Sequence, residues 1–291
     1  MRQVGYGNPT AGEWGGYPWP PVAVRQVGYG NPTTAGETVG RLSVARSSRR
    51  KSDMDAHGQS MAAWPALESY SRRVALPGCG VSLFAYDVGP AEAAPLVLIH
   101  GLGNEADTWR YVIPPLAERF RVVAPDLPGF GRSDKPRRAY TVPFFRDALL
   151  ELLDVLGIRK ACLAGHSLGA IIAHFAVLTH PDRVERLVLV AGGLLAPSQK
   201  LDAATLLFLI PCVGESLYRR FQRNPDAAYR SLEPYYSRLG DLPEAERAFL
   251  YRRVNERVRD EAQRRAFFSA FRVWRCGCRR SSEACAVPWR V

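Results

Sequence analysis

Short apolar runs alternate with longer stretches of helical periodicity through the middle of the chain. Two runs, at 71–76 and 81–88, flank a Pro/Gly turn and predict a pair of strands. Four more apolar runs predict strands at 95–100, 121–125, 161–164 and 184–190. The stretches between them predict helices at about 106–119, 144–156 and 168–179. Strands and helices that alternate at this spacing predict an α/β fold with a mostly parallel, doubly wound sheet.

The alternation of strands and helices stops near residue 197. Residues 197–272 carry several helical stretches in a row, and we expect them to form a helical cap inserted after a core of residues 68–196. Packing between helices is the more common role of apolar side chains at helical spacing, although they could also line an acyl pocket. In the cap these side chains include Leu206, Leu207, Phe208, Leu209 and Phe221.

The first 60 residues have a different composition. Residues 2–10 recur unchanged at 25–33, and a Ser/Arg run follows at 47–52. Two Gly- and Pro-rich copies are too few for a repeat fold, and such a segment buries too little apolar surface to offset its chain entropy. We therefore expect residues 1–60 to form a disordered, repeat-containing extension, or an upstream repeat translated ahead of a later start.

The chain of 291 residues has a formal net charge of +11, a balance that nucleic-acid-binding proteins often show. Between residues 61 and 272, however, there are 28 basic and 23 acidic side chains. The arginines between 252 and 265 alternate with Glu256, Asp260 and Glu261, which is typical of a solvated helix face. The chain also has no recognisable nucleic-acid motif, so we expect no nucleic-acid partner.

Cysteine usage and hydropathy indicate the compartment. The chain has six cysteines, and no apolar signal segment follows Met1, so we expect free thiols and a cytoplasmic location. Cys276 and Cys278 have no second Cys/His pair nearby, and we therefore expect neither a metal nor a cofactor. No apolar run reaches the length of about 18 residues that a membrane-spanning helix needs. The sequence makes no prediction of the oligomeric state.

The segment 163–170 carries the strongest chemical signal. It places Gly165, His166, Ser167 and Gly169 in a GxSxG pattern, at the end of a predicted strand and the start of a predicted helix. A serine at such a tight turn is held clear of the sheet, and the small residues on either side let strand and helix approach closely. The helix N-terminus then directs free N–H groups toward a developing negative charge.

Two further motifs follow predicted strands. His100, Gly101, Leu102 and Gly103 follow the third strand, and an Asp/Gly/Pro-rich turn at 126–134 follows the fourth. Open α/β sheets place their functional sites at the carboxyl ends of the strands. We therefore expect these two segments and the GxSxG segment to meet at one edge of the sheet.

With these three motifs in this order, residues 68–272 resemble the α/β-hydrolase family. The resemblance is to the branch with an HG-x-G loop, a D-x-P-G-x-G-x-S turn and a GHSLG nucleophile elbow. It implies that Ser167 is the nucleophile and that the backbone N–H groups of Leu102 and Leu168 form the oxyanion hole. It also implies that His100 shapes the oxyanion loop and is not the catalytic base. A serine at the elbow argues against dehalogenase and epoxide-hydrolase chemistry, for which we would expect an aspartate.

The second half of the family's catalytic triad is not recognisable. The triad runs Ser, then Asp or Glu, then His, and only His174 and His180 follow Ser167. His174 lies about 10 Å farther along the same predicted helix, and His180 lies at its end. Residues 273–291 contain a single acid, Glu283, in a Cys/Arg/Trp/Ser-rich context. The catalytic acid and the catalytic His are therefore unassigned, and we expect 273–291 to be a non-homologous tail.

Two consequences follow from this departure. We expect the last strands of the sheet to be missing, which would leave the strand at 184–190 as an unprotected apolar edge that favours aggregation. We also expect a serine hydrolase that acts on an ester or a related small acyl substrate, with impaired activity in this chain. The alternative is a non-catalytic α/β-hydrolase-like binding protein that keeps the pocket and has lost the triad.

Overall fold

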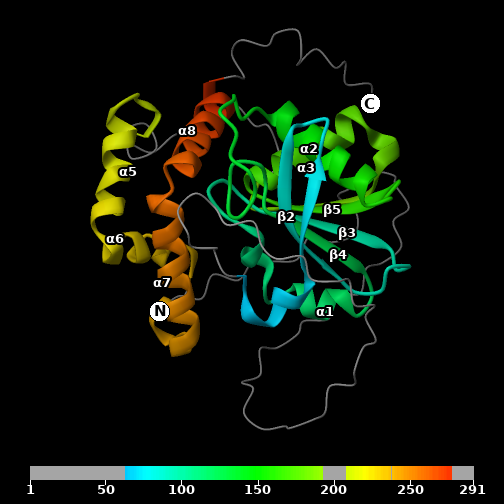
Figure 1. The fold of residues 1–291 in the computed structure, drawn as a ribbon, viewed down its shortest axis with the longest axis horizontal. Coiled ribbons are helices and arrows are strands. Elements are labelled where there is room, and N and C mark those ends of the chain that lie inside the picture. Colours follow the sequence, from blue (N-terminus) through cyan, green and yellow to red (C-terminus); the bar gives the residue numbers. More distant parts are fainter. Residues whose placement is uncertain (1–62, 193–207, 237, 277–291) are drawn as a thin grey trace, which may run out of the picture. The chain divides into compact units, whose positions relative to one another are not determined.

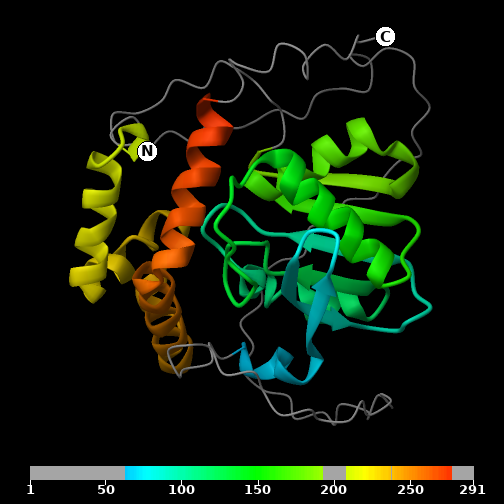
Figure 2. The same cartoon turned by 45° about the horizontal axis from the view of Figure 1, so that its top comes forward.

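The computed structural model describes residues 63–192, 208–236 and 238–276, and every structural statement below concerns these residues. They form one sheet with helices on both faces, and a further group of helices lies beside it (Figures 1 and 2). The predicted N-terminal extension and most of the predicted C-terminal tail lie outside the described residues.

The sheet has six strands in the order β1-β2-β4-β3-β5-β6. The strands are β1 (Ser71–Leu76), β2 (Val81–Val88), β3 (Pro95–Ile99), β4 (Arg121–Pro125), β5 (Ala161–His166) and β6 (Val184–Val190). β2 pairs antiparallel with β1 and β4, whereas β4, β3, β5 and β6 run parallel. The prediction of an α/β fold with a mostly parallel sheet is confirmed.

Side chains of the central strands alternate between two hydrophobic clusters, one on each face of the sheet. In β3, Val97 and Ile99 join the cluster under the helices α2 (Val142–Val155) and α3 (Leu168–Thr179). Leu96 and Leu98 point to the opposite face, where α1 (Ile113–Ala117) packs (Figure 1). Burial on both faces explains why these strands are continuous apolar runs.

The helix predicted at about 106–119 is instead two short helices. A 3-10 helix, η2 (Ala106–Trp109), is followed by α1, whose first turn contains Pro114 and Pro115. Proline lacks an N–H and clashes with a preceding helical turn, so one continuous helix cannot run through this segment. Further short 3-10 helices occur as η1 (Pro65–Tyr70), η3 (Pro181–Arg183), η4 (Glu233–Tyr235) and η5 (Leu239–Asp241).

The strand β6 forms one edge of the described sheet. It pairs only with β5 among the described strands, and Val188, Leu189 and Val190 are 51%, 37% and 41% exposed. These exposures are high for the end of a strand whose parallel neighbour β5 is mostly buried. The described sheet thus has the exposed apolar edge that the sequence predicts at 184–190.

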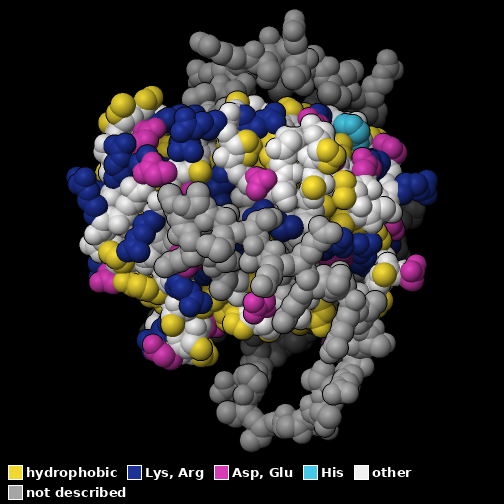
Figure 3. Space-filling view, viewed as in Figure 1, with side chains coloured by type: hydrophobic (Ala, Val, Ile, Leu, Met, Phe, Trp, Pro, Cys, Tyr) yellow, Lys and Arg dark blue, Asp and Glu magenta, His cyan; other side chains and the backbone are white. Residues whose placement is uncertain are grey.

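Four helices pack against one another beside the sheet: α5 (Val213–Arg223), α6 (Pro225–Arg230), α7 (Glu244–Arg259) and α8 (Glu261–Cys276). We call them the cap helices. Acidic and basic side chains are interspersed over the visible described surface (Figure 3). The prediction of a fully solvated arginine face is nevertheless wrong for Arg253 and Arg257 of α7, which are 1% and 11% exposed. No described helix is both long and apolar enough to cross a membrane.

Candidate active site

Ser167 occupies a strained turn between β5 and α3. Its φ and ψ angles are 52° and −113°, a combination that non-glycine residues rarely adopt. The Ser167 N–H donates to the carbonyl of Val190 in β6 (2.9 Å), and the Ser167 carbonyl accepts from the N–H of Ala170 (3.0 Å). Hydrogen bonds on both sides therefore hold the backbone in this conformation.

The two glycines of the GxSxG segment allow close packing of strand and helix. A Cβ on Gly165 would collide with the backbone of Gly169 and Ala170, and a Cβ on Gly169 would collide with the backbone carbonyls of Ile99 and His100. Gly192 after β6 was not predicted to belong to the site, and a Cβ on it would lie 2.9 Å from the Ser167 carbonyl oxygen. The Gly–Gly pair that ends the predicted strand was the signal for it.

His100 is fully buried at the end of β3. Its Nδ1 donates to the carbonyl of Gly101 (2.8 Å), and its Nε2 accepts from the N–H of Leu127 (2.8 Å). Burial lowers the pKa of His100 to about 4, which keeps the ring neutral with both nitrogens occupied. The imidazole thus joins the loop after β3 to the turn after β4, and it has no free nitrogen to act as a base.

The loop after β3 lies against Ser167 because β3 and β5 are neighbours, with Ile99 opposite Gly165. A Cβ on Gly101 would lie 3.2 Å from the Ser167 Cβ. Leu102 is the next residue in this loop, and Leu168 is the first residue of α3, where backbone N–H groups have no partner within the helix. The structure therefore brings Leu102, from the neighbouring loop, and Leu168, the next residue in the chain, close to Ser167.

Ser167 and the loop after β3 line a cavity of about 660 Å³ between the sheet and the cap helices. A volume of about 300–1,000 Å³ is typical of small-molecule sites. From the core the lining includes Gly101, Leu102, Gly103, His166 and Ser167. From the cap helices and adjoining segments it includes Phe208, Tyr218, Phe221, Phe249 and Phe267. Phe208 and Phe221 thus line the cavity, and Phe221 also packs between cap helices.

A buried network of charged side chains joins α7 to the segment between β3 and α1, which also lines the cavity. Arg253 forms ion pairs with Glu105, and Arg110 Nη2 lies 2.5 Å from Glu246 Oε1. Burial, and then the neighbouring Arg257, lower the pKa of Arg253 to about 10. These residues were not predictable, because Glu105 and Arg253 are 148 positions apart and no local pattern in the sequence marks them.

The turn after β4 is connected to this network through Asp126 and Arg132. Asp126 is fully buried and accepts hydrogen bonds from the N–H of Ala106 (2.6 Å) and from the N–H and Nε of Arg132 (2.7 and 2.8 Å). Burial raises the pKa of Asp126, but the Arg132 guanidinium outweighs burial and lowers it overall. The Asp126 carboxylate thus fixes the loop geometry and does not face Ser167 as a free acid.

A partner pair for Ser167 is not assembled by the described residues around the cavity. The single imidazole among the described lining residues is His166, whose buried Nδ1 has no hydrogen-bond partner in the described part of the chain. Burial lowers the pKa of His166. The lining carboxylates Glu105 and Asp107 are paired with Arg253 and Arg132. The described residues also contain no cluster of His, Cys, Asp and Glu that could hold a metal.

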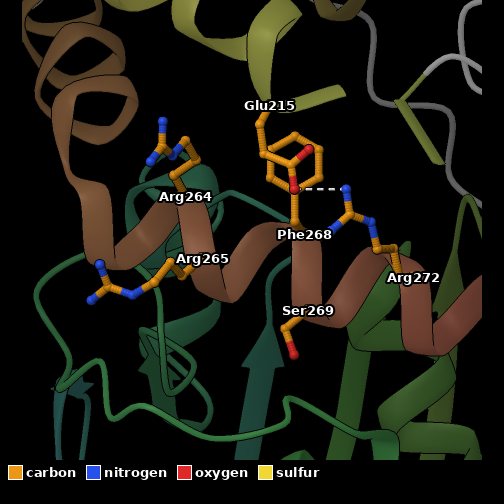
Figure 4. Close-up of a pocket in the computed structure, with 6 residues that line it drawn as sticks. All are labelled: Glu215, Arg264, Arg265, Phe268, Ser269 and Arg272. Carbon is orange, nitrogen blue, oxygen red and sulfur yellow. Dashed lines mark ion pairs between the residues drawn. The ribbon is translucent and has the colours of Figure 1, made fainter. Parts of the chain in front are cut away.

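A smaller cavity of about 260 Å³ lies between α5 and α8 and is separate from Ser167 (Figure 4). Arg272 of α8 pairs with Glu215 of α5 across Phe268, at 2.7 Å. Ser269 points away toward the core, where its Oγ accepts from the N–H of Tyr140 (3.0 Å). These contacts join the cap helices to each other and to the core.

The fold is that of a known family. Residues 94–272 match the model of the alpha/beta hydrolase fold family, and the chain belongs to this family.

Similar proteins include several hydrolases. A 2-hydroxymuconate semialdehyde hydrolase of Pseudomonas sp. is 43% identical over 115 residues, which are 38% of this chain and 41% of that protein. A haloalkane dehalogenase of Mycobacterium marinum is 35% identical over 144 residues, 48% of each. The crystal structure of 2-hydroxy-6-oxo-6-phenylhexa-2,4-dienoate hydrolase from Rhodococcus sp. matches with a TM-score of 0.57 at 25% identity, covering 72% of this chain and 73% of that one.

The chain spans only part of its curated relatives. It covers 30% of the length of uncharacterized proteins of Mycobacterium bovis and Mycobacterium tuberculosis, to which it is 45% identical over 105 residues. The match shows membership of the alpha/beta hydrolase fold family, and several of the characterised relatives are hydrolases. The reaction and substrate of this protein are therefore matters for proposal.

Proposed function

We propose that the protein is a serine hydrolase that acts on an ester or a related small acyl substrate. In this proposal Ser167 Oγ attacks the carbonyl carbon, and the N–H groups of Leu102 and Leu168 bind the oxyanion that forms. Collapse of this intermediate breaks the bond to the leaving group, which departs with the proton that Ser167 Oγ has lost, and leaves an acyl group on Ser167. Water then cleaves the acyl–Ser167 ester, which releases the carboxylic acid and restores the serine hydroxyl.

The single observation that carries the proposal is the strained turn at Ser167. Backbone strain persists only where the surroundings enforce it, and such positions concentrate at functional sites. Here the turn places Ser167 in a 660 Å³ cavity, at the N-terminus of α3 and against the loop that contains Leu102. Free N–H groups at a helix N-terminus favour negative charge, as an acyl-transfer intermediate requires.

We further propose that turnover by this chain is impaired, because a serine hydroxyl is a weak nucleophile without a base. The second candidate function, a non-catalytic binding protein, is favoured by one observation. The lining imidazole His166 has no carboxylate partner in the described part of the chain.

One experiment separates these proposals. The purified chain is treated with a fluorophosphonate probe and with a short-chain 4-nitrophenyl ester, alongside Ser167→Ala and Ser231→Ala. Ser231 also lines the cavity and is the matched control. We expect labelling that is lost only in Ser167→Ala, with ester turnover that is slow relative to labelling. Equal labelling of all three proteins would exclude Ser167 as the nucleophile, and folded protein without labelling would favour the binding protein.

A further inference from the structure

Arg257 of α7 lies beside the loop that contains the proposed oxyanion hole. Its Nη1 donates to Asn104 Oδ1 (2.9 Å) and to the carbonyl of Gly103 (3.3 Å). Gly103 and Asn104 directly follow Leu102, and Arg257 lines the same cavity as Ser167. The guanidinium is therefore fixed to the loop by one nitrogen, and its side chain is only 11% exposed.

The charge of Arg257 is poorly matched within the described residues. The other two arginines that line the cavity have close carboxylate partners: Arg253 pairs with Glu105 and Glu256, and Arg110 pairs with Glu246. Among the described residues, the one carboxylate within ion-pair distance of Arg257 is that of Glu105, at 3.9 Å.

Glu105 already pairs with Arg253, so it offers Arg257 little compensation. Burial lowers the pKa of Arg257, because it keeps this cation away from water, and the more distant Asp107 and Asp126 offset that effect only in part. A buried cation without a close counter-ion is costly, and an incoming anion would offset that cost.

Much of the described cavity wall is apolar or aromatic and includes Tyr218, Phe221, Val254, Val258 and Phe267. The carboxylates in the described lining, Glu105 and Asp107, are already paired with Arg253 and Arg132. The apolar groups would desolvate the body of a ligand, and Tyr218 adds a hydroxyl that can form a hydrogen bond. One unmatched guanidinium can balance a singly charged carboxylate through paired N–H donors, but it cannot balance a doubly charged phosphate.

We propose that Arg257 binds the carboxylate of an acyl substrate whose reacting carbonyl lies at Ser167. This inference rests on the proposed function for the reaction itself, but the binding site is a separate claim. The substrate class is then acyl compounds that carry a second, ionised carboxyl group, such as half-esters of dicarboxylic acids. Neutral esters of the same length would lack the pairing with Arg257.

The test measures binding without turnover. Ser167→Ala protein is titrated by calorimetry with the monomethyl esters of succinate, glutarate and adipate, and with the uncharged dimethyl esters. We expect at least one monomethyl ester to bind about tenfold or more tightly than its dimethyl counterpart, because a hydrogen-bonded charge pair is lost in the neutral ligand. If the charged and neutral esters bind equally tightly across the series, the proposal is overturned, and no Arg257 variant is needed to reach that conclusion.

Variants then assign the preference to one side chain. Arg257→Gln should abolish the preference for the charged ester, Arg257→Lys should keep part of it, and Arg259→Gln, at an exposed position of α7, should leave it unchanged. If Arg257→Gln weakens both esters equally, Arg257 only positions the loop and the proposal fails. The two proposals can also fail separately. If the preference for the charged ester depends on Arg257 but Ser167 does not react with the fluorophosphonate, the anion-binding proposal stands and the hydrolase proposal fails.

Discussion

At the scale of single residues, the burial of His100 is expected to make the stability of the fold depend on pH. It is fully buried, and both ring nitrogens are engaged by the backbone of Gly101 and Leu127. The pKa of His100 is about 4 in the folded chain and about 6.5 in an unfolded one. Between these values the unfolded state binds more protons, so the contribution of His100 to stability is present above about pH 6.5 and is lost toward pH 4.

We therefore predict that the free energy of unfolding falls by about 3 kcal/mol through His100 as the pH drops from about 6.5 to about 4. The measurement is urea unfolding at several pH values. His100→Gln should be less stable at neutral pH and should show a flatter pH dependence in this window. His180→Gln, at the end of α3 and outside the core, should keep the original slope. If His100→Gln kept the original pH dependence of the free energy of unfolding, the assignment of that dependence to His100 would be contradicted.

The residues around Ser167 differ in how far the sequence could predict them. Gly165, Ser167 and Gly169 were accessible because a strand-to-helix turn imposes a local spacing. Glu105 and Arg253 were not accessible, because their pairing depends on the three-dimensional position of α7 over a loop 148 residues earlier. An arginine that alternates with acidic residues has the same local pattern whether it is solvated or buried.

At the scale of elements, the position of α7 depends on the buried pair of Glu105 and Arg253. Their side chains are 5% and 1% exposed, and Arg253 Nε donates to Glu105 Oε1 at 3.2 Å. Removal of one partner leaves the other as a buried charge with less compensation. Breaking such a pair typically costs about 3–5 kcal/mol, although the pair itself need not stabilise the fold by that amount.

We predict that Glu105→Gln and Arg253→Gln each lower the free energy of unfolding by about 3–5 kcal/mol. The loss of stability in the double variant should be smaller than the sum of the losses in the two single variants. The second change removes the buried charge that the first change left without its partner. Chemical denaturation of all four proteins gives the coupling energy. Arg259→Gln, an exposed position on the same helix, should change stability by less than about 0.5 kcal/mol. Strict additivity would show that the two side chains do not depend on each other.

At this scale, strands could be predicted from the sequence more reliably than the helix expected at 106–119. The strands β2, β3, β4 and β5 were predictable because buried strands are short apolar runs between turns. The predicted helix is not continuous because Pro114 and Pro115 lie in the first turn of α1, and a proline there prevents an earlier helix from running on into α1. The positions of the cap helices were beyond prediction, since their contacts with the core, such as Gln263 with the N–H of Gly131, join distant segments.

At the scale of the whole molecule, the exposed edge at β6 is a candidate contact between copies of the chain. Val188, Leu189 and Val190 present apolar side chains there, and within the described part of the chain the backbone of β6 pairs with β5 alone. Such an edge is a template for pairing with another chain. A charged side chain at the edge is the usual way in which proteins prevent that pairing.

We predict that the chain self-associates at micromolar concentrations and that Val188→Lys reduces this association. Val188 is 51% exposed, so the free energy of unfolding should change by less than about 0.5 kcal/mol. Light scattering over a concentration series provides the measurement. Val155→Lys, which adds the same charge at a 49% exposed position at the end of α2, is the control and should associate like the original chain. Equal association of all three proteins would show that β6 is not the contact.

The pairing of β3 with β5 has a kinetic consequence. Gly101 and Ser167 are far apart in the sequence, and β4 and α2 lie between them. Contacts with a large sequence separation form slowly, because the intervening loop must close first. During refolding, the chain should therefore complete β4 and the crossover through α2 before Ser167 meets the loop after β3. Covalent labelling of Ser167 at successive refolding times would then report closure of this crossover rather than the earlier formation of helices.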